Sequence, residues 1–237
     1  MLYPMIGMNR PGSVHQWRVP CATYGLLGVN ALLFLYVVAL GSSGEAFLDR
    51  WGLTSASLTD DLAGRSVHPA VLATIFTAMF LHANLVHLLS NLLFLWVFGE
   101  RVEQRLGGAR FVSLYLAGGT IAAVVQVATT AESGLVAVGS SGAVAAVIGA
   151  YLALHPYAPL AGFVPRAFRV PVDTVAVALL GIWVLSQALG GLAAVGYATM
   201  SVAQGALWAH LGGFVAGLTL GPLLRGAQRR ATPRLGV

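Results

Sequence analysis

Long apolar runs dominate the pattern along the chain, and polar residues gather between them. A helix needs about 20 residues to cross a hydrocarbon core of about 30 Å. Six runs approach or reach that length, near residues 21–40, 79–98, 110–130, 141–157, 171–190 and 200–224. The pattern therefore predicts an all-α fold, a polytopic membrane protein built as a bundle of six transmembrane helices.

The segments around these runs predict a simple domain organisation. We expect residues 1–20 to form a cytoplasmic N-terminal segment, residues 21–224 one six-helix domain, and residues 225–237 a basic cytoplasmic tail. The longest connection, 41–78, is too polar to span a membrane, but it turns apolar again from Pro69 to Phe80. Long ordered connections are uncommon and often functional.

Composition agrees with a membrane protein and excludes several other classes. The chain is 57% apolar and 9% charged, whereas soluble domains average about 25% charged residues. The single cysteine, Cys21, excludes an intrachain disulfide and a cysteine-rich metal site. The sequence has no carboxylate pair within an apolar run and no phosphate-binding loop, so we expect no metal or nucleotide cofactor.

The basic residues, all 13 of them arginine, predict the topology. With the N-terminus inside, only Arg50 and Arg65 fall outside, and this is a strong positive-inside bias. The bias predicts a plasma membrane protein with both termini cytoplasmic, and the short soluble parts are typical of a bacterial protein. No folded segment gathers arginines on one face, so we expect no nucleic acid as a partner. As a membrane protein, the chain is expected to interact with the lipid bilayer. The inside set is Arg10, Arg18, Arg101, Arg105, Arg110, Arg166, Arg169, Arg225, Arg229, Arg230 and Arg234.

Polar residues inside apolar runs are costly, and they usually face the bundle interior or a water-filled cavity. The second run contains His82, His87 and Asn91. His87 and Asn91 are four residues apart, so they share one helix face. Both could donate hydrogen bonds to one point, as an oxyanion site requires. Polar contact between helices is an equally weighted alternative.

Two further polar positions open the fourth run and interrupt the sixth. Gly139-Ser140-Ser141-Gly142 places serine at a helix N-terminus, where backbone N–H groups lack partners and the helix dipole favours negative charge. A plain helix cap is the alternative. His210 stands alone in the sixth run, and a single buried histidine is more often structural than catalytic.

Small residues connect these two positions. Gly213 and Gly217 share the helix face of His210, and a stripe of glycine and alanine follows Ser141. Such stripes let helices approach closely. If they pack together, His210 would lie within hydrogen-bond reach of Ser141, the pair that nucleophilic catalysis requires. The second stripe is Gly142, Ala145, Ala146, Gly149, Ala150 and Ala153.

These motifs, taken in order, resemble those of the rhomboid family of intramembrane proteases. The resemblance covers nearly the whole chain from the first run to the sixth. The matching positions are His82, His87 and Asn91 for His-x4-His-x3-Asn; Gly139, Ser141 and Gly142 for Gly-x-Ser-Gly; Ala209, His210, Gly213 and Gly217 for Ala-His-x2-Gly-x3-Gly; and Glu103 and Gly107 in the turn after the second run.

The resemblance implies a six-helix rhomboid bundle and a serine endopeptidase that cleaves membrane proteins within or beside their transmembrane segments. Ser141, rather than Ser140, would be the nucleophile and His210 its general base. Asn91, His87 and the Ser141 backbone N–H would hold the oxyanion. His82 would be structural or a further site residue, and the fifth run would be a lateral gate. Transmembrane proteins would be the substrates, and the oligomeric state is not indicated.

Two positions depart from the family pattern, and the first of them leaves a function other than cleavage open. Ala145 stands where family members often carry an aromatic residue that stacks on the base, and Trp51 is followed by Gly52 instead of arginine. A rhomboid-like protein that binds transmembrane helices without cutting them is one alternative. A small transporter or channel is another, although it does not explain why the serine and histidine motifs occur together.

Overall fold

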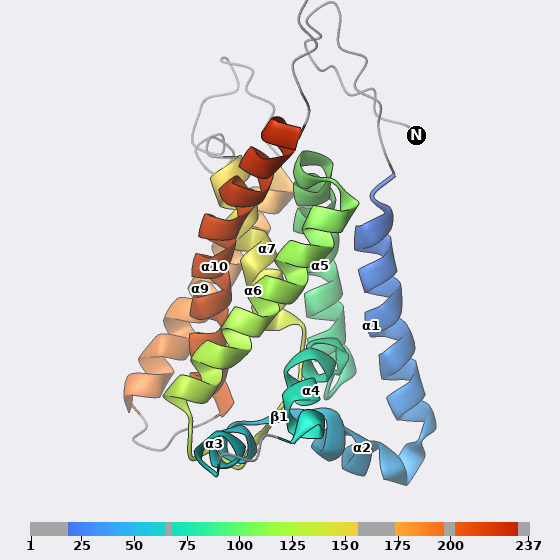
Figure 1. The fold of residues 1–237 in the computed structure, drawn as a ribbon, viewed down its shortest axis with the longest axis vertical. Coiled ribbons are helices and arrows are strands. Elements are labelled where there is room, and N and C mark those ends of the chain that lie inside the picture. The colour runs from blue at the N-terminus through green and yellow to red at the C-terminus, as the bar shows by residue number, and fades with distance from the viewer. Residues whose placement is uncertain (1–18, 65–67, 156–173, 197–201, 232–237) are drawn as a thin grey trace, which may run out of the picture.

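A computed structural model describes residues 19–64, 68–155, 174–196 and 202–231, and these are almost entirely helical (Figure 1). The helices are α1 (Cys21–Ala39), α2 (Gly44–Trp51), α3 (Ser55–Ala63), α4 (Pro69–Thr77), α5 (Leu85–Leu106), α6 (Gly108–Thr129), α7 (Ser141–Leu154), α9 (Thr174–Gly196) and α10 (Val202–Ala231). Two 3₁₀ turns, η1 (Gly41–Ser43) and η2 (Ala78–Phe80), and two short strands, β1 (Leu53–Thr54) and β2 (Val136–Ala137), complete the described elements.

The all-helical class predicted from the sequence is confirmed. Among the described residues, four helices are long and apolar enough to cross a membrane: α1, α5, α6 and the Gly205–Gly226 part of α10. The described segments Pro69–Phe80, Ser141–Leu154 and Ala176–Leu189 are apolar but shorter. At 1.5 Å per residue, the 14 residues of α7 extend about 21 Å, less than the thickness of a hydrocarbon core.

One helix begins later than the sequence pattern predicts. The second run was expected from residue 79, but α5 starts only at Leu85, after η2 and an extended segment. The Asn84 side chain accepts a hydrogen bond from the His87 N–H at 2.9 Å, and this N-cap fixes the start of the helix. The apolar residues 79–81 belong instead to the connection that packs under α7.

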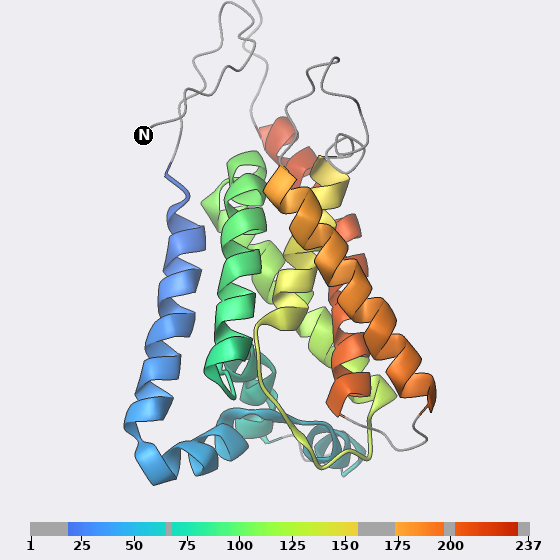
Figure 2. The same cartoon turned by 180° about the vertical axis from the view of Figure 1, so that it is seen from behind.

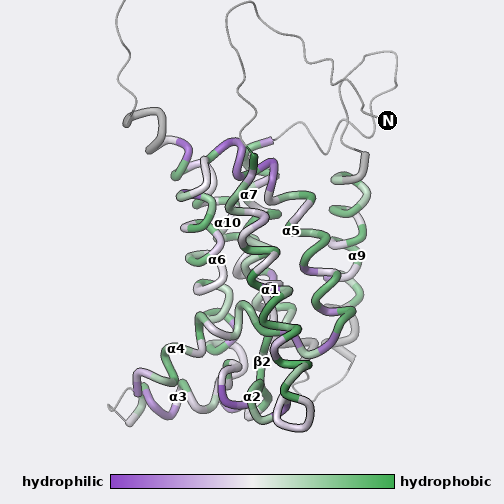
Figure 3. The backbone as a smooth tube through the Cα atoms, turned by 90° about the vertical axis from the view of Figure 1, so that its right-hand side faces the viewer, coloured by the Kyte–Doolittle hydropathy of each residue, from purple (hydrophilic) through white to green (hydrophobic). Residues whose placement is uncertain are grey.

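Helix α7 occupies the centre of the bundle, between α5, α6 and α10 (Figures 1 and 2). Every residue from Gly142 to Tyr151 is buried. The outer helices carry apolar side chains on their exposed faces, such as Leu32 and Leu35 of α1, and the hydropathy of the helices remains high along the bundle (Figure 3). A helix with no polar face is typical of a membrane interior.

The tightest packing joins α7 to α10, which confirms the predicted contact between the two stripes of small residues. A Cβ atom at Gly213 would overlap the carbonyl oxygen of Gly142, and one at Gly217 would overlap that of Ala146. The backbones are therefore in direct contact at two successive helical turns. This contact sets the position of His210 relative to the beginning of α7.

Helix α1 lies at the side of the bundle and is held there by a buried carboxylate (Figure 2). Glu103 of α5 accepts hydrogen bonds from the Ala22 N–H at 3.0 Å and from the Thr23 N–H and hydroxyl at 2.7 Å each. These donors belong to the first turn of α1, where no intrahelical acceptor exists. Glu103, predicted through the family resemblance, thus has a structural role in joining α1 to α5.

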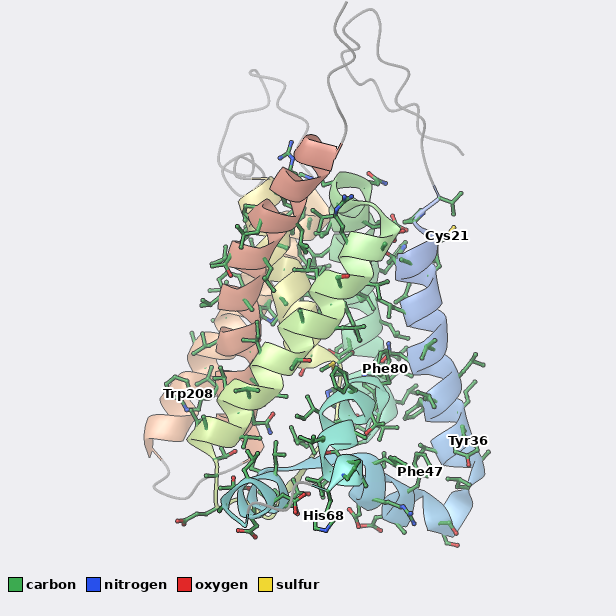
Figure 4. All side chains as sticks on the ribbon, in the orientation of Figure 1. Cys21, Tyr36, Phe47, His68, Phe80 and Trp208 are labelled. Atoms are coloured by element: carbon green, nitrogen blue, oxygen red, sulfur yellow. The ribbon has the colours of Figure 1, made fainter. Side chains whose placement is uncertain are left out.

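The connection 41–78 forms an ordered layer across one end of the bundle, at residues 41–64 and 68–78. Strand β1 pairs with β2 in antiparallel register, Leu53 opposite Ala137, and so joins this layer to the segment that leads into α7. Tyr36 and Phe47, labelled in Figure 4, pack edge to face with ring centroids 5.5 Å apart at the end of α1. Asp61 accepts a hydrogen bond from the His68 N–H at 2.8 Å, and the contacts with His68 lower the pKa of the Asp61 carboxyl.

The arginines that the structure describes are divided between the two ends. Arg101, Arg105, Arg110 and Arg225 lie at the end opposite the α2–α4 layer, whereas Arg50 lies in that layer. At the arginine-rich end, Arg105 Nε donates to His155 Nε2 at 3.2 Å. Arg65, Arg166 and Arg169 lie outside the described residues, as do residues 1–18 of the predicted N-terminal segment and residues 232–237 of the predicted tail.

We predict that Gly217→Ala destabilises the protein by roughly 2 kcal/mol or more, because the added methyl must force α10 away from the Ala146 carbonyl. Thermal unfolding in detergent measures the effect. Gly226→Ala is the matched control on the same helix, since nothing lies within 4 Å of its Cβ position. Equal stability of the two variants would contradict the close contact of α7 and α10.

Candidate active site

The segment after β2 carries the chain from the α2–α4 layer into the bundle, where α7 begins (Figure 2). Gly139 in this segment has φ +135°, a conformation that favours glycine, and its N–H donates to the Ala78 carbonyl at 2.9 Å. A Cβ atom here would lie 2.6 Å from Cε1 of His87. Glycine at 139 therefore serves both the turn and the close approach of the His87 ring.

The two serines at the start of α7 have different surroundings. Ser140 is buried, and its Oγ lies 3.3 Å from Nε2 of His82, which is itself buried. Ser141 is half-buried and lines a cavity. The structure thus turns one serine toward the protein interior and the other toward open space.

His210 lines the same cavity from α10. Its Nδ1 lies 2.8 Å from Oε1 of Gln187, a residue of α9. Among the described residues, no hydrogen bond joins Ser141 Oγ to the His210 ring. Hydrogen bonds between catalytic groups are often long without substrate and tighten when it binds.

His87 and Asn91 of α5 also face this cavity. Asn91 is buried, yet its amide Nδ2 has no hydrogen-bond partner. Buried polar groups are nearly always paired, and an unpaired one costs about 1–3 kcal/mol. Three buried side-chain atoms of the described residues are unpaired, Asn30 Oδ1, His82 Nδ1 and Asn91 Nδ2, but only Asn91 belongs to a residue that lines the cavity. The buried Asn91 amide is thus left without an acceptor at the cavity wall.

The cavity has a volume of about 620 Å³ and is lined mainly by residues of α5, α6, α7, α9 and α10, with further residues from α4, η2 and the two short strands. Its wall is mostly apolar, with a few polar groups that converge, as in small-molecule and peptide sites. Of the sequence-predicted site residues, it brings together Ser141, His210, His87, Asn91, Gly139 and Gly142. His82 lies behind Ser140, and Gly213 and Gly217 lie in the α7–α10 contact.

Sequence reasoning did not single out Gln187 or Ser90, which also line the cavity. Trp183 of α9 stacks on Phe214 with ring centroids 5.2 Å apart and also lines the cavity. A polar residue in the fifth run was a usable signal for Gln187, since such residues rarely face lipid. Within the described part of the chain, no group of three or more His, Cys, Asp or Glu side chains is placed to hold a metal ion.

Comparison with known proteins identifies the family. The Rhomboid domain matches residues 69–227, more than half of the chain, and the chain therefore belongs to the rhomboid family of intramembrane proteases. It is a multi-pass membrane protein.

Three curated relatives are similar over parts of their length. RHOMBOID-like protein 6, mitochondrial, of Arabidopsis thaliana is 36% identical over 78 residues, 33% of this chain and 25% of that protein. RHOMBOID-like protein 7 of the same plant is 32% identical over 89 residues, 38% of this chain and 28% of that protein. Rhomboid protease GluP of Bacillus subtilis (strain 168) is 30% identical over 141 residues, 59% of this chain and 26% of that protein. The match thus spans about a quarter of the length of each relative.

We predict that Ser140→Ala destabilises the protein by about 1–2 kcal/mol, because His82 would lose its hydrogen-bond partner at Nε2. Thermal unfolding in detergent compares this variant with Ser113→Ala, whose hydroxyl is exposed and bonds only its own helix. An equal effect of both substitutions would show that the Ser140–His82 contact contributes nothing.

Proposed function

We propose that the protein is an intramembrane serine endopeptidase with a Ser141–His210 dyad, which cleaves transmembrane or juxtamembrane segments of other membrane proteins. The observation that carries the proposal is the shared cavity. Ser141 and His210 line it from α7 and α10, and Asn91, whose buried amide Nδ2 is unpaired, lines the same cavity. Membership of the rhomboid family supports the same activity.

The proposed reaction follows the acyl-transfer sequence of serine proteases. Ser141 Oγ attacks the scissile carbonyl while His210 takes its proton, and His210 then gives that proton to the leaving amine. The resulting ester between Ser141 and the substrate acyl group is hydrolysed by water, which His210 deprotonates in turn. No acidic third residue is needed for this proton balance.

The oxyanion of the tetrahedral intermediate needs preorganised donors. We assign this role to the Asn91 amide, to His87 and to the backbone N–H of Ser141. Ser141 is the first residue of α7, so its N–H has no intrahelical acceptor. The unpaired state of Asn91 Nδ2 supports this assignment, because a bound oxyanion would supply the missing acceptor.

We further propose a bundle of six transmembrane helices at residues 21–224, in which α7 and α9 complete the four helices of membrane length. Cytoplasmic segments 1–20 and 225–237 would flank it, in the plasma membrane of a bacterium. Arg101 and Arg105 lie near the end of α5 and Arg110 at the start of α6, where both helices reach the same end of the bundle, and this supports a cytoplasmic position for that end. Ser141 would then open toward the outer side, below the membrane surface, where non-helical backbone is tolerated if it lines a water-filled cavity.

The decisive experiment uses protein reconstituted in lipid vesicles with a fluorescently labelled single-span substrate that carries small residues near a helix-destabilised segment. We expect Ser141→Ala and His210→Ala to abolish cleavage and Ser140→Ala to retain it. Ser90→Ala, another serine that lines the cavity, is the matched control. Full cleavage by Ser141→Ala would overturn the mechanism. Binding of the substrate without cleavage by the wild type would favour a binding protein, and ion or solute flux instead would favour a transporter.

A second prediction concerns the oxyanion donors. Asn91→Ala should lower kcat by roughly 10²–10³-fold with little change in KM, because the amide is proposed to bind the transition state more strongly than the substrate. Steady-state cleavage in the same vesicles measures both constants. A rise in KM at constant kcat would assign Asn91 to substrate binding instead.

A further inference from the structure

We propose that Gln187 of α9 is a positioning residue for His210: its amide oxygen holds the proton of the imidazole on Nδ1, so that Nε2 is free to act as the base. This inference rests on the proposed function, since it names the residue that prepares the base of the dyad. The contact that carries it joins Gln187 Oε1 and His210 Nδ1 at 2.8 Å.

The direction of this hydrogen bond follows from the chemistry of the two groups. An amide oxygen only accepts, so the ring nitrogen that faces it must donate. A neutral imidazole carries one proton, and if Nδ1 holds it, Nε2 keeps its lone pair. That is the tautomer in which a histidine accepts a proton from a serine hydroxyl at Nε2.

The orientation of the Gln187 amide is fixed by its other hydrogen bonds. The Ser186 hydroxyl donates to the Trp183 carbonyl at 2.7 Å, so its proton is already used. Ser186 Oγ lies 3.0 Å from Gln187 Nε2 and must therefore accept from it. Gln187 Nε2 also faces the Trp183 carbonyl at 3.5 Å. A reversed amide would place its oxygen against this carbonyl, so Oε1 is the atom that faces His210.

Among the described residues, no other hydrogen bond to the His210 ring is present. The residue four positions after Ser141 is Ala145, which is fully buried and has no aromatic ring or polar atom to hold the imidazole. Gln187 and His210 are both half-buried in the cavity wall, where water competes less for the hydrogen bond than at a surface. Helix α9 thus contributes a group, Gln187, that acts on the base and not on the substrate.

The kinetic test compares three variants in the vesicle assay. Gln187→Met keeps the length of the side chain but removes the acceptor, and we expect kcat to fall about 10- to 100-fold with KM unchanged. Gln187→Glu restores an acceptor in the same place and should keep kcat within about threefold of the wild type, since carboxylates hold the same ring nitrogen in serine protease triads. Leu185→Ala, on the exposed face of α9, is the control for general effects on this helix.

A spectroscopic test needs no substrate and works in the Ser141→Ala background. The ¹⁵N chemical shifts of labelled histidine distinguish the two imidazole tautomers, and the spectrum of His210→Gln identifies the His210 signals. We expect His210 to carry its proton on Nδ1, and Gln187→Met to produce a mixture of tautomers. This measurement also decides the matter if Gln187→Met loses activity by misfolding, because Gln187→Glu must still retain the Nδ1 proton.

The inference is overturned if Gln187→Met cleaves like the wild type, if Gln187→Glu loses as much kcat as Gln187→Met, or if His210 carries its proton on Nε2. These failures are separable from failure of the proposed function. Without Ser141-dependent cleavage by the wild type the protease assignment falls, whereas the tautomer of His210 still tests the contact with Gln187.

Discussion

The direct backbone contact between α7 and α10 is the constraint on which the rest of the site depends. Gly213 and Gly217 leave room for the carbonyls of Gly142 and Ala146, so the two helices lie closer than any side chain would allow. Within a membrane, apolar side chains do not drive helices together as they do in water, and close packing of small residues has to hold them. The same contact places His210 of α10 in the wall of the cavity that Ser141 also lines.

Polar side chains within the bundle are of two kinds. Some are satisfied by hydrogen bonds that join helices, and others have an unpaired atom. Glu103 is satisfied by three donors of the first turn of α1, which makes it a structural connection. Asn91, in contrast, is buried with an unpaired amide beside a cavity. Such a group is costly in a low-dielectric interior, and the cost is understandable if a transition state supplies the acceptor. Gln187 is a polar residue in an apolar helix, and such residues face the bundle interior. There it contacts His210, the proposed base.

Much of this arrangement could be predicted from the sequence, because the helical spacing of residues and the size of their side chains can be read from short segments. The stripes at Gly142–Ala153 and Gly213–Gly217 predicted the helix contact, and the spacing of His87 and Asn91 predicted that they share one face of a helix. The start of α5 was predicted too early, because residues 79–81 are apolar without being part of the long helix. Gln187 was missed because a single glutamine in an apolar run does not reveal its partner across 23 residues. Pairing of β1 with β2 was also invisible, since two-residue strands leave no alternating pattern.

The most direct test of the Ser141–His210 dyad is labelling with a fluorophosphonate, which reacts preferentially with activated serines, followed by mass spectrometry of the labelled peptide. The account predicts that Ser141 is modified in the wild type and that a folded His210→Ala variant is not labelled. Labelling at Ser140, undiminished labelling in His210→Ala, or a wild-type protein that cleaves its substrate without ever being labelled at Ser141 would contradict it.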